Sequence, residues 1–239
     1  MSRTFSSLPP SVEQRLSGWV MIQERLAHHV EPKLRPTITI SRQFGCEGFP
    51  LAERLKVLME EVSGESWNIY DKTLLEKVAE DEGISMNLLR KMGDIVRRLE
   101  LLGLNSGNYV TQDAAFEKVA KHILQIAKVG NALIVGRGGA ILCHELTNSF
   151  HFRMEASFEW RVQSLMERLD LPQDEVEKTV KTRSKLRDKF ISQCLNANVG
   201  DLQHYDAVFN NERHSVEAIA QAILAYVREA WEDKSYFRH

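Results

Sequence analysis

Residues 37–55, TITISRQFGCEGFPLAERL, carry the pattern that decides the fold. A β-branched run at 37–40 meets a turn with two glycines, Gly45 and Gly48, and a helical pattern begins near Pro50. A strand, a glycine turn and a helix in this order can form a phosphate cradle. Glycines let backbone N–H groups approach an anion, and the helix N-terminus adds partial positive charge. The sequence therefore predicts an anion site at this turn.

The turn lacks two side chains of the full phosphate-loop pattern, G-x-x-x-x-G-K-[ST]. Phe49 and Pro50 follow Gly48, so the lysine and the hydroxyl that binds Mg²⁺ are both missing. Glu47 also lies in the turn, where a carboxylate repels phosphate. Arg42 could supply the missing positive charge, because a guanidinium suits bidentate phosphate contact. Alternatively, the glycines serve only to reverse the chain.

The composition is that of an ordinary globular protein, with 239 residues, 43% hydrophobic and 27% charged. This length suffices for one sizeable α/β domain with an insertion. The net charge of −2 gives no indication of a general nucleic-acid binder. Three widely spaced cysteines favour reduced thiols, and the first thirty residues lack a continuous apolar run, so we expect a cytoplasmic protein without a membrane span.

Hydrophobic periodicity predicts strands that alternate with helices. Strands are predicted at 37–41, 67–70, 132–135, 150–154 and 206–210. Helices are predicted at about 11–31, 50–62, 72–82, 85–99, 112–129, 157–169, 173–196 and 215–231. This alternation indicates a parallel sheet with helices on both faces, and ligands then bind at the carboxyl ends of the strands.

Charged residues follow two of the predicted strands. Arg137 lies in the glycine turn 136–139 after the strand at 132–135, where it contacts either an anion or a structural salt-bridge partner. Asp71 follows the strand at 67–70 and either orients a substrate or caps the next helix. Both residues are therefore candidates for a site at the strand ends.

The segment 178–190, KTVKTRSKLRDKF, carries six basic residues and one acid. On a helix this pattern is either a solvated face or a lid. In a lid, arginines such as Arg183 close onto transferring phosphate groups and neutralise the developing charge.

Several segments form an ordered set along the chain. They read ISRQFGCEGFPLAERL at 40–55, YDKTLL at 70–75, VGRGGAIL at 135–142, FRMEASFEWRV at 152–162 and GDLQHYDAVFNN at 200–211. This set resembles the cytidylate-kinase-like family of P-loop proteins, whose opening is usually close to ISREYGSGGREIAERL. The resemblance covers about 37–229 and leaves the predicted helix at 11–31 outside.

The resemblance implies an α/β, nucleoside-monophosphate-kinase-like fold of the P-loop NTPase type. In it, helices flank a five-stranded parallel sheet, with a helical substrate region near 72–112 and a lid at about 170–200. The domain would span 36–232, after an N-terminal extension at 1–35 and before a tail at 233–239. The implied reaction moves the γ-phosphoryl group of ATP to CMP or dCMP with Mg²⁺, and no residue of this chain is assigned to the metal.

The resemblance also implies roles for single residues. Phosphate contact is expected from Ser41, Gly45, Cys46 and Gly48, substrate contact from Asp71 and Arg137, and catalytic charge from Arg42 and Arg183. The chain departs from the family pattern at Glu47, Phe49 and Pro50, and Gly138 stands where the family has an acid. Two hypotheses remain. One is an ATP-dependent nucleoside-monophosphate kinase with a degenerate loop, and the other is an inactive nucleotide- or anion-binding protein with a regulatory or scaffolding role.

The predicted helix at 11–31 needs a partner surface, because an isolated helix of this length is marginal in water. Its apolar side includes Trp19, Ile22 and Leu26. That side packs either on its own domain or in a homodimer, and we favour the homodimer. Otherwise we expect nucleotides as partners, and neither nucleic acid nor a membrane.

Overall fold

A computed structural model of the chain describes residues 34–71 and 110–237, and its five strands form a single parallel sheet. The strand order is β2-β3-β1-β4-β5. The strands are β1 (Thr37–Arg42), β2 (Asn68–Tyr70), β3 (Ala132–Val135), β4 (Ser149–Glu155) and β5 (Ala207–Asn210). The prediction of a five-stranded parallel sheet flanked by helices is therefore confirmed.

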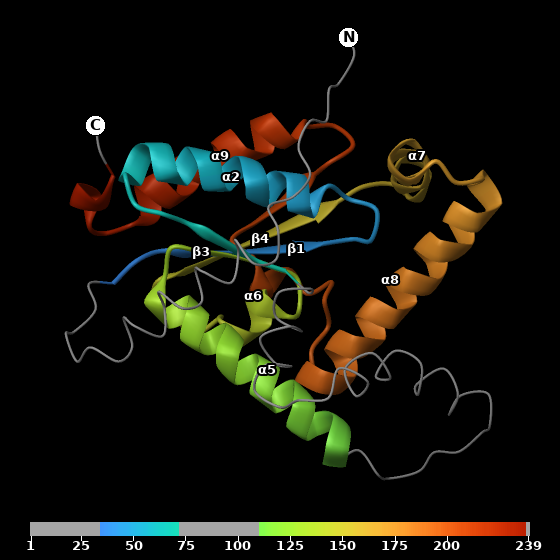
Figure 1. The fold of residues 1–239 in the computed structure, drawn as a ribbon, viewed down its shortest axis with the longest axis horizontal. Helices are drawn as coiled ribbons and strands as arrows, with labels where there is room; N and C mark the ends of the chain where they lie inside the picture. The colour runs from blue at the N-terminus through green and yellow to red at the C-terminus, as the bar shows by residue number, and fades with distance from the viewer. Residues whose placement is uncertain (1–33, 72–109, 238–239) are drawn as a thin grey trace.

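Helices cover both faces of the sheet and its carboxyl end. They are α2 (Gly48–Ser63), α5 (Val110–Val129), α6 (Gly139–Leu142), α7 (Phe158–Leu169), α8 (Gln173–Leu195) and α9 (Val216–Ala230), with the short 3₁₀ helices η1 (Leu202–His204) and η2 (Lys234–Tyr236). Figure 1 shows α2 and α9 on one face, α5 and α6 on the other, and α7 and α8 beyond the ends of the strands. None of the helices within the described ranges is both long and apolar enough to span a membrane.

Most predicted elements within the described residues lie within a few residues of their observed bounds. The four-residue helix α6 was not predicted, because one helical turn leaves no periodic signal. The predicted helices at 11–31, 72–82 and 85–99 lie outside the described residues, and so does the proposed homodimer contact. The domain bounds of 36–232 stay a prediction.

Alternating side chains give strand β1 an apolar face and a polar face. Ile38 and Ile40 are fully buried in the core that α2 and α9 cover. On the opposite face, three residues of β1 align with three polar residues of β4. The aligned pairs are Thr37 with Ser149, Thr39 with His151 and Ser41 with Arg153.

The aligned polar pairs bring hydrogen-bonding groups together between the two central strands. Thr39 Oγ1 lies 2.8 Å from His151 Nδ1. At the carboxyl end of the strands, Arg153 Nη1 donates to Ser41 Oγ at 3.2 Å. Because buried polar groups need partners, this register fixes Arg153 beside the loop that follows β1.

Candidate functional site

The glycines of the loop between β1 and α2 make room for arginine side chains. Gly45 has a φ of +107°, and a Cβ atom there would lie 2.7 Å from the Cβ of Arg161. A Cβ atom at Gly48 would lie 3.0 Å from Cδ of Arg42. The loop can therefore approach α7 and fold over Arg42 only because these two positions have no side chain.

Two backbone N–H groups of the loop already have partners in the protein. Cys46 N donates to the carbonyl of Gln43 at 3.2 Å. Glu47 N donates to Asn211 Oδ1 at 2.9 Å, and Asn211 Nδ2 donates back to the Glu47 carboxylate at 3.2 Å. An anion bound to this loop would have to break these bonds to use those two groups. Burial also raises the pKa of the Cys46 thiol to about 11, so the thiol stays neutral.

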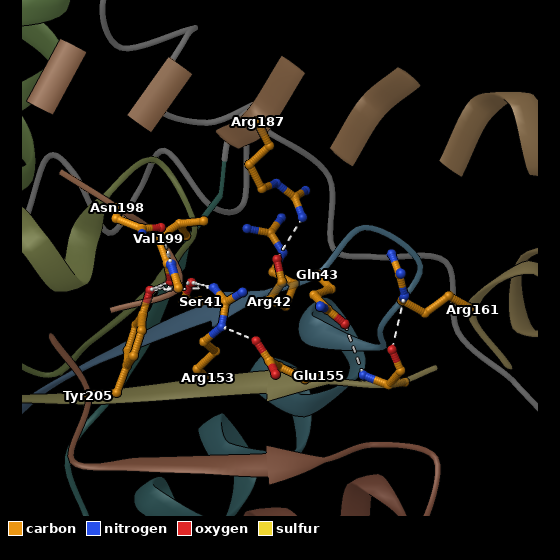
Figure 2. Close-up of polar contacts among 12 residues, drawn as sticks. Ser41, Arg42, Gln43, Arg153, Glu155, Arg161, Arg187, Asn198, Val199 and Tyr205 are labelled. Carbon is orange, nitrogen blue, oxygen red and sulfur yellow. Dashed lines mark hydrogen bonds and ion pairs between the residues drawn. The ribbon is translucent and has the colours of Figure 1, made fainter. Parts of the chain in front are cut away.

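Three arginines of α7 and α8 donate hydrogen bonds to carbonyl groups of the same loop. The pairs are Arg187 with Arg42 O at 2.7 Å, Arg161 with Phe44 O at 3.1 Å, and Arg168 with Gly45 O. Figure 2 shows Arg187 and Arg161 approaching the loop from different directions. These contacts tie both helices to the loop and leave its carbonyl groups facing cations.

Arg42 lies between two glycine turns at the end of β1. A Cβ atom at Gly136 would lie only 1.9 Å from Arg42 Nη1, so the guanidinium rests directly on the Gly136 backbone. Burial lowers the pKa of Arg42 to about 9, and the nearby positive charges of Arg187 and Arg137 add to the effect. The negative charge of Asp71 acts in the opposite direction and raises the pKa of Arg42. The surroundings of Arg42 thus favour a bound anion.

Arg153 places a second buried guanidinium beside this region. Only 5% of its side chain is exposed. Its Nε donates to Glu155 Oε1 at 2.7 Å, and its Nη1 also donates to the hydroxyl of Tyr205 at 3.4 Å. The hydroxyl of Tyr205 in turn donates to the carbonyl of Val199 at 2.9 Å (Figure 2). Arg153 is therefore held in one position by groups from three separate segments.

The charged residues predicted for the site fall into two groups in the structure. Arg42, Asp71 and Arg137 lie together, since both Asp71 and Arg137 influence the pKa of Arg42. Arg183, by contrast, is exposed on α8, and Arg187 on the next turn reaches the loop instead. The guanidinium of Arg137 also stacks on the ring of Phe190 in α8, 5.5 Å from its centroid.

The departure at Gly138 has a structural reason. Gly138 has a φ of +71°, and a Cβ atom there would lie 2.2 Å from Cδ1 of Leu195 near the end of α8. An acidic side chain at this position would collide with Leu195 of α8 in its present place. The glycine thus allows α8 to pack close to the turn after β3.

Four arginines were not among the residues predicted to form the site. They are Arg153, Arg161, Arg168 and Arg187. A signal existed for Arg153, because a charged residue between Phe152 and Met154 in a buried strand requires a polar partner. Nothing local distinguishes the others from basic residues on a solvated helix face.

The oxygen atoms at the strand ends are not free to coordinate a magnesium ion, which prefers hydroxyl and carboxylate oxygens as protein ligands. The Ser41 hydroxyl at the end of β1 accepts a hydrogen bond from Arg153, and Glu155 is paired with the same arginine. Asp71 adjoins Arg42. In the described ranges, no three His, Cys, Asp or Glu side chains gather in a way that could hold a metal ion.

Comparison with solved structures gives similarities of fold. An uncharacterized protein from Eubacterium ventriosum matches with a TM-score of 0.59 and 18% identity, over 82% of this chain and 99% of that chain. A shikimate kinase from Acinetobacter baumannii in complex with shikimate matches with a TM-score of 0.46 and 13% identity, over 83% and 96%. No curated protein matches the chain.

A family model provides the comparison that places the chain. The model of the cytidylate kinase-like family matches residues 37–213. The match begins with β1, includes the loop and helices α7 and α8, and ends just after β5. It covers well over half of the sequence, and the chain therefore belongs to the cytidylate kinase-like family.

Proposed function

We propose that this protein binds nucleoside phosphates and transfers a phosphoryl group from ATP to a nucleoside monophosphate, with CMP or dCMP as the first acceptors to test. The binding site is an arginine cluster, defined as Arg42, Arg137, Arg153 and Arg187. The observation that carries the proposal is the convergence of these four side chains from β1, the turn after β3, β4 and α8. Besides burial, charges of this cluster lower the pKa of two of its members: Arg187 and Arg137 act on Arg42, and Arg153 and Arg137 act on Arg187.

The chemistry of phosphoryl transfer fits such a cluster. Catalysis of this reaction depends mainly on positioning and on the stabilisation of charge on the transferring group. Guanidinium groups can contact phosphate oxygens in bidentate fashion and remain charged in proteins. Arg42 and Arg153 are fixed by β1 and β4, so they would hold the phosphates. Arg187 belongs to α8 and would follow any movement of the lid.

A second candidate is a protein that binds nucleotides without turnover. The observation that favours it is the state of the loop, where the N–H groups of Cys46 and Glu47 are already bonded and the Glu47 carboxylate is buried. The loop also lacks the lysine that bridges the β- and γ-phosphates in ordinary nucleotide kinases. Loss of one such contact costs about 10²–10³ in rate, so we expect slow or absent transfer to CMP.

Calorimetry and a coupled turnover assay test both candidates. Arg187→Gln should weaken ATP binding by about 1.5–3 kcal/mol, the range for hydrogen bonds to charged groups. The matched control is Arg228→Gln, which removes an exposed positive charge on α9, on the far side of the sheet from α5 and α6. Unchanged ATP affinity in Arg187→Gln, or no ATP binding by the wild type, would contradict the proposed site.

The turnover assay then separates the two candidates. It uses ATP with a panel of nucleoside monophosphates, CMP and dCMP included. Turnover on the order of 1–100 s⁻¹, the usual kinase range, would show that the arginines compensate for the degenerate loop. Binding without detectable turnover on any acceptor would instead support the binding protein.

A further inference from the structure

The environment of Ser41 is the starting point. Its hydroxyl lies at the carboxyl end of β1, the place where a kinase could offer an oxygen to a metal ion carried by its nucleotide. Instead, Ser41 Oγ accepts a hydrogen bond from Arg153 Nη1 at 3.2 Å and lies 3.3 Å from the hydroxyl of Tyr205. A metal ion coordinated by Ser41 would lie beside the guanidinium of Arg153, a residue whose side chain is only 5% exposed. Two neighbouring cations repel each other strongly where water is excluded.

The position that follows the second loop glycine offers no alternative oxygen. Phe49 stands there, and its ring packs against the core under α2 and α9. In the general phosphate-loop pattern, Phe49 stands in the place of the lysine, and Pro50, the next residue, stands in the place of the metal-binding hydroxyl. The chain therefore puts an apolar side chain and a guanidinium where a nucleotide kinase needs oxygen ligands.

The carboxylates around the site are engaged with arginines or with an amide. Glu155 accepts from Arg153, Glu47 is held by Asn211, and Asp71 adjoins Arg42. Asp188, which is exposed on α8, acts on Arg187. A divalent cation would have to compete with fixed positive charges for each of the carboxylates that face the arginines.

We propose that the arginine cluster takes the place of a divalent cation, so that this site binds the metal-free polyphosphate in preference to its magnesium complex. The proposal rests on the proposed nucleotide-binding function and specifies the form of ligand that the site accepts. Guanidinium groups and magnesium neutralise the same phosphate oxygens, so one can replace the other in binding. A nucleotide that already carries magnesium has a net charge two units less negative, because it brings a divalent cation beside Arg153.

The test is a comparison of ATP binding with and without magnesium. Calorimetry measures ATP affinity in EDTA and in excess MgCl₂ at matched ionic strength, and inorganic tripolyphosphate serves as a second probe without a base or sugar. We expect metal-free ATP to bind about tenfold more tightly than its magnesium complex, because the complex adds positive charge beside a partly buried cationic site. Tripolyphosphate should show the same preference.

Two variants make the result specific. Arg187→Gln should reduce the preference for metal-free ATP, whereas Arg228→Gln on α9 should leave it as in the wild type. Binding of ATP only with magnesium, or more tightly with it, would overturn this inference and leave the proposed nucleotide-binding function standing. No binding in either condition would reject the proposed function and this inference with it.

Discussion

The substitution Gly136→Ala would test whether the position of Arg42 controls ligand binding. Gly136 has a φ of +79°, and a Cβ atom there would lie 1.9 Å from Arg42 Nη1. Such a contact is far shorter than two heavy atoms tolerate. The guanidinium is the end of a flexible side chain, so it can move away while the backbone stays in place.

The expected magnitudes differ for stability and for binding. Alanine in the left-handed region costs about 1–2 kcal/mol in the folded state. Displacement of Arg42 would remove its contact with a bound phosphate, which is a loss of about 1.5–3 kcal/mol. In affinity this corresponds to a factor of roughly 10–150. The variant should therefore remain folded and bind metal-free ATP much more weakly than the wild type.

Gly64→Ala is the matched control for backbone strain. Gly64 ends α2 with a φ of 68°, and its N–H donates to the carbonyl of Glu60 at 2.9 Å. Denaturant unfolding should show similar losses of stability for both variants, and calorimetry should show lost ATP affinity for Gly136→Ala alone. Wild-type affinity in Gly136→Ala would refute the claim that the second glycine turn positions Arg42 for the ligand.

Two further predictions concern stability. Burial lowers the pKa of His151 from 6.5 to about 4, so acidification below pH 6.5 protonates the unfolded chain first and stability falls until the pH reaches the folded value. Between pH 7.5 and 5 this effect should remove about 2 kcal/mol from the free energy of unfolding, measured in urea. The variant His151→Asn should lose this dependence of stability on pH. The control His214→Asn, at an exposed histidine, should keep it. Tyr236→Phe should cost about 1–3 kcal/mol, because the Tyr236 hydroxyl donates to Asn131 and accepts from Trp67 in the core; an unchanged urea midpoint would contradict this.

Much of the sheet could be predicted because its signals are local. The β-branched run of β1 and the apolar run of β3 each lie next to a glycine turn, and α2 and α9 follow with helical periodicity. Strand order is not local information, and the ordered motifs of the family supplied the expected five-stranded parallel sheet. The core on the α2 and α9 side then follows from the alternation of side chains along β1.

The arginines of the site were harder to predict, because their partners are distant in sequence. Arg153 reaches Ser41 across 112 residues, and the pairing depends on the register of β4 against β1. On α8, the basic pattern makes Arg183 and Arg187 equivalent, yet only Arg187 bonds to the loop. The helical turn that meets the loop is set by the position along the helix at which the two cross. A periodic sequence pattern carries no information about that position.

The glycine pattern itself has two physical explanations that a sequence cannot separate. In a phosphate cradle, glycines leave space for an anion, but here they leave space for arginine side chains. Arg161 lies against Gly45, and Arg42 lies against both Gly48 and Gly136. Because arginine side chains occupy that space, positive charge reaches the strand ends through guanidinium groups rather than through backbone N–H groups alone. Binding by guanidinium groups can be altered one charge at a time without substituting the glycines of the loop. Under the proposed function, single arginine substitutions, more than changes to the glycines of the first loop, would therefore decide what this site binds.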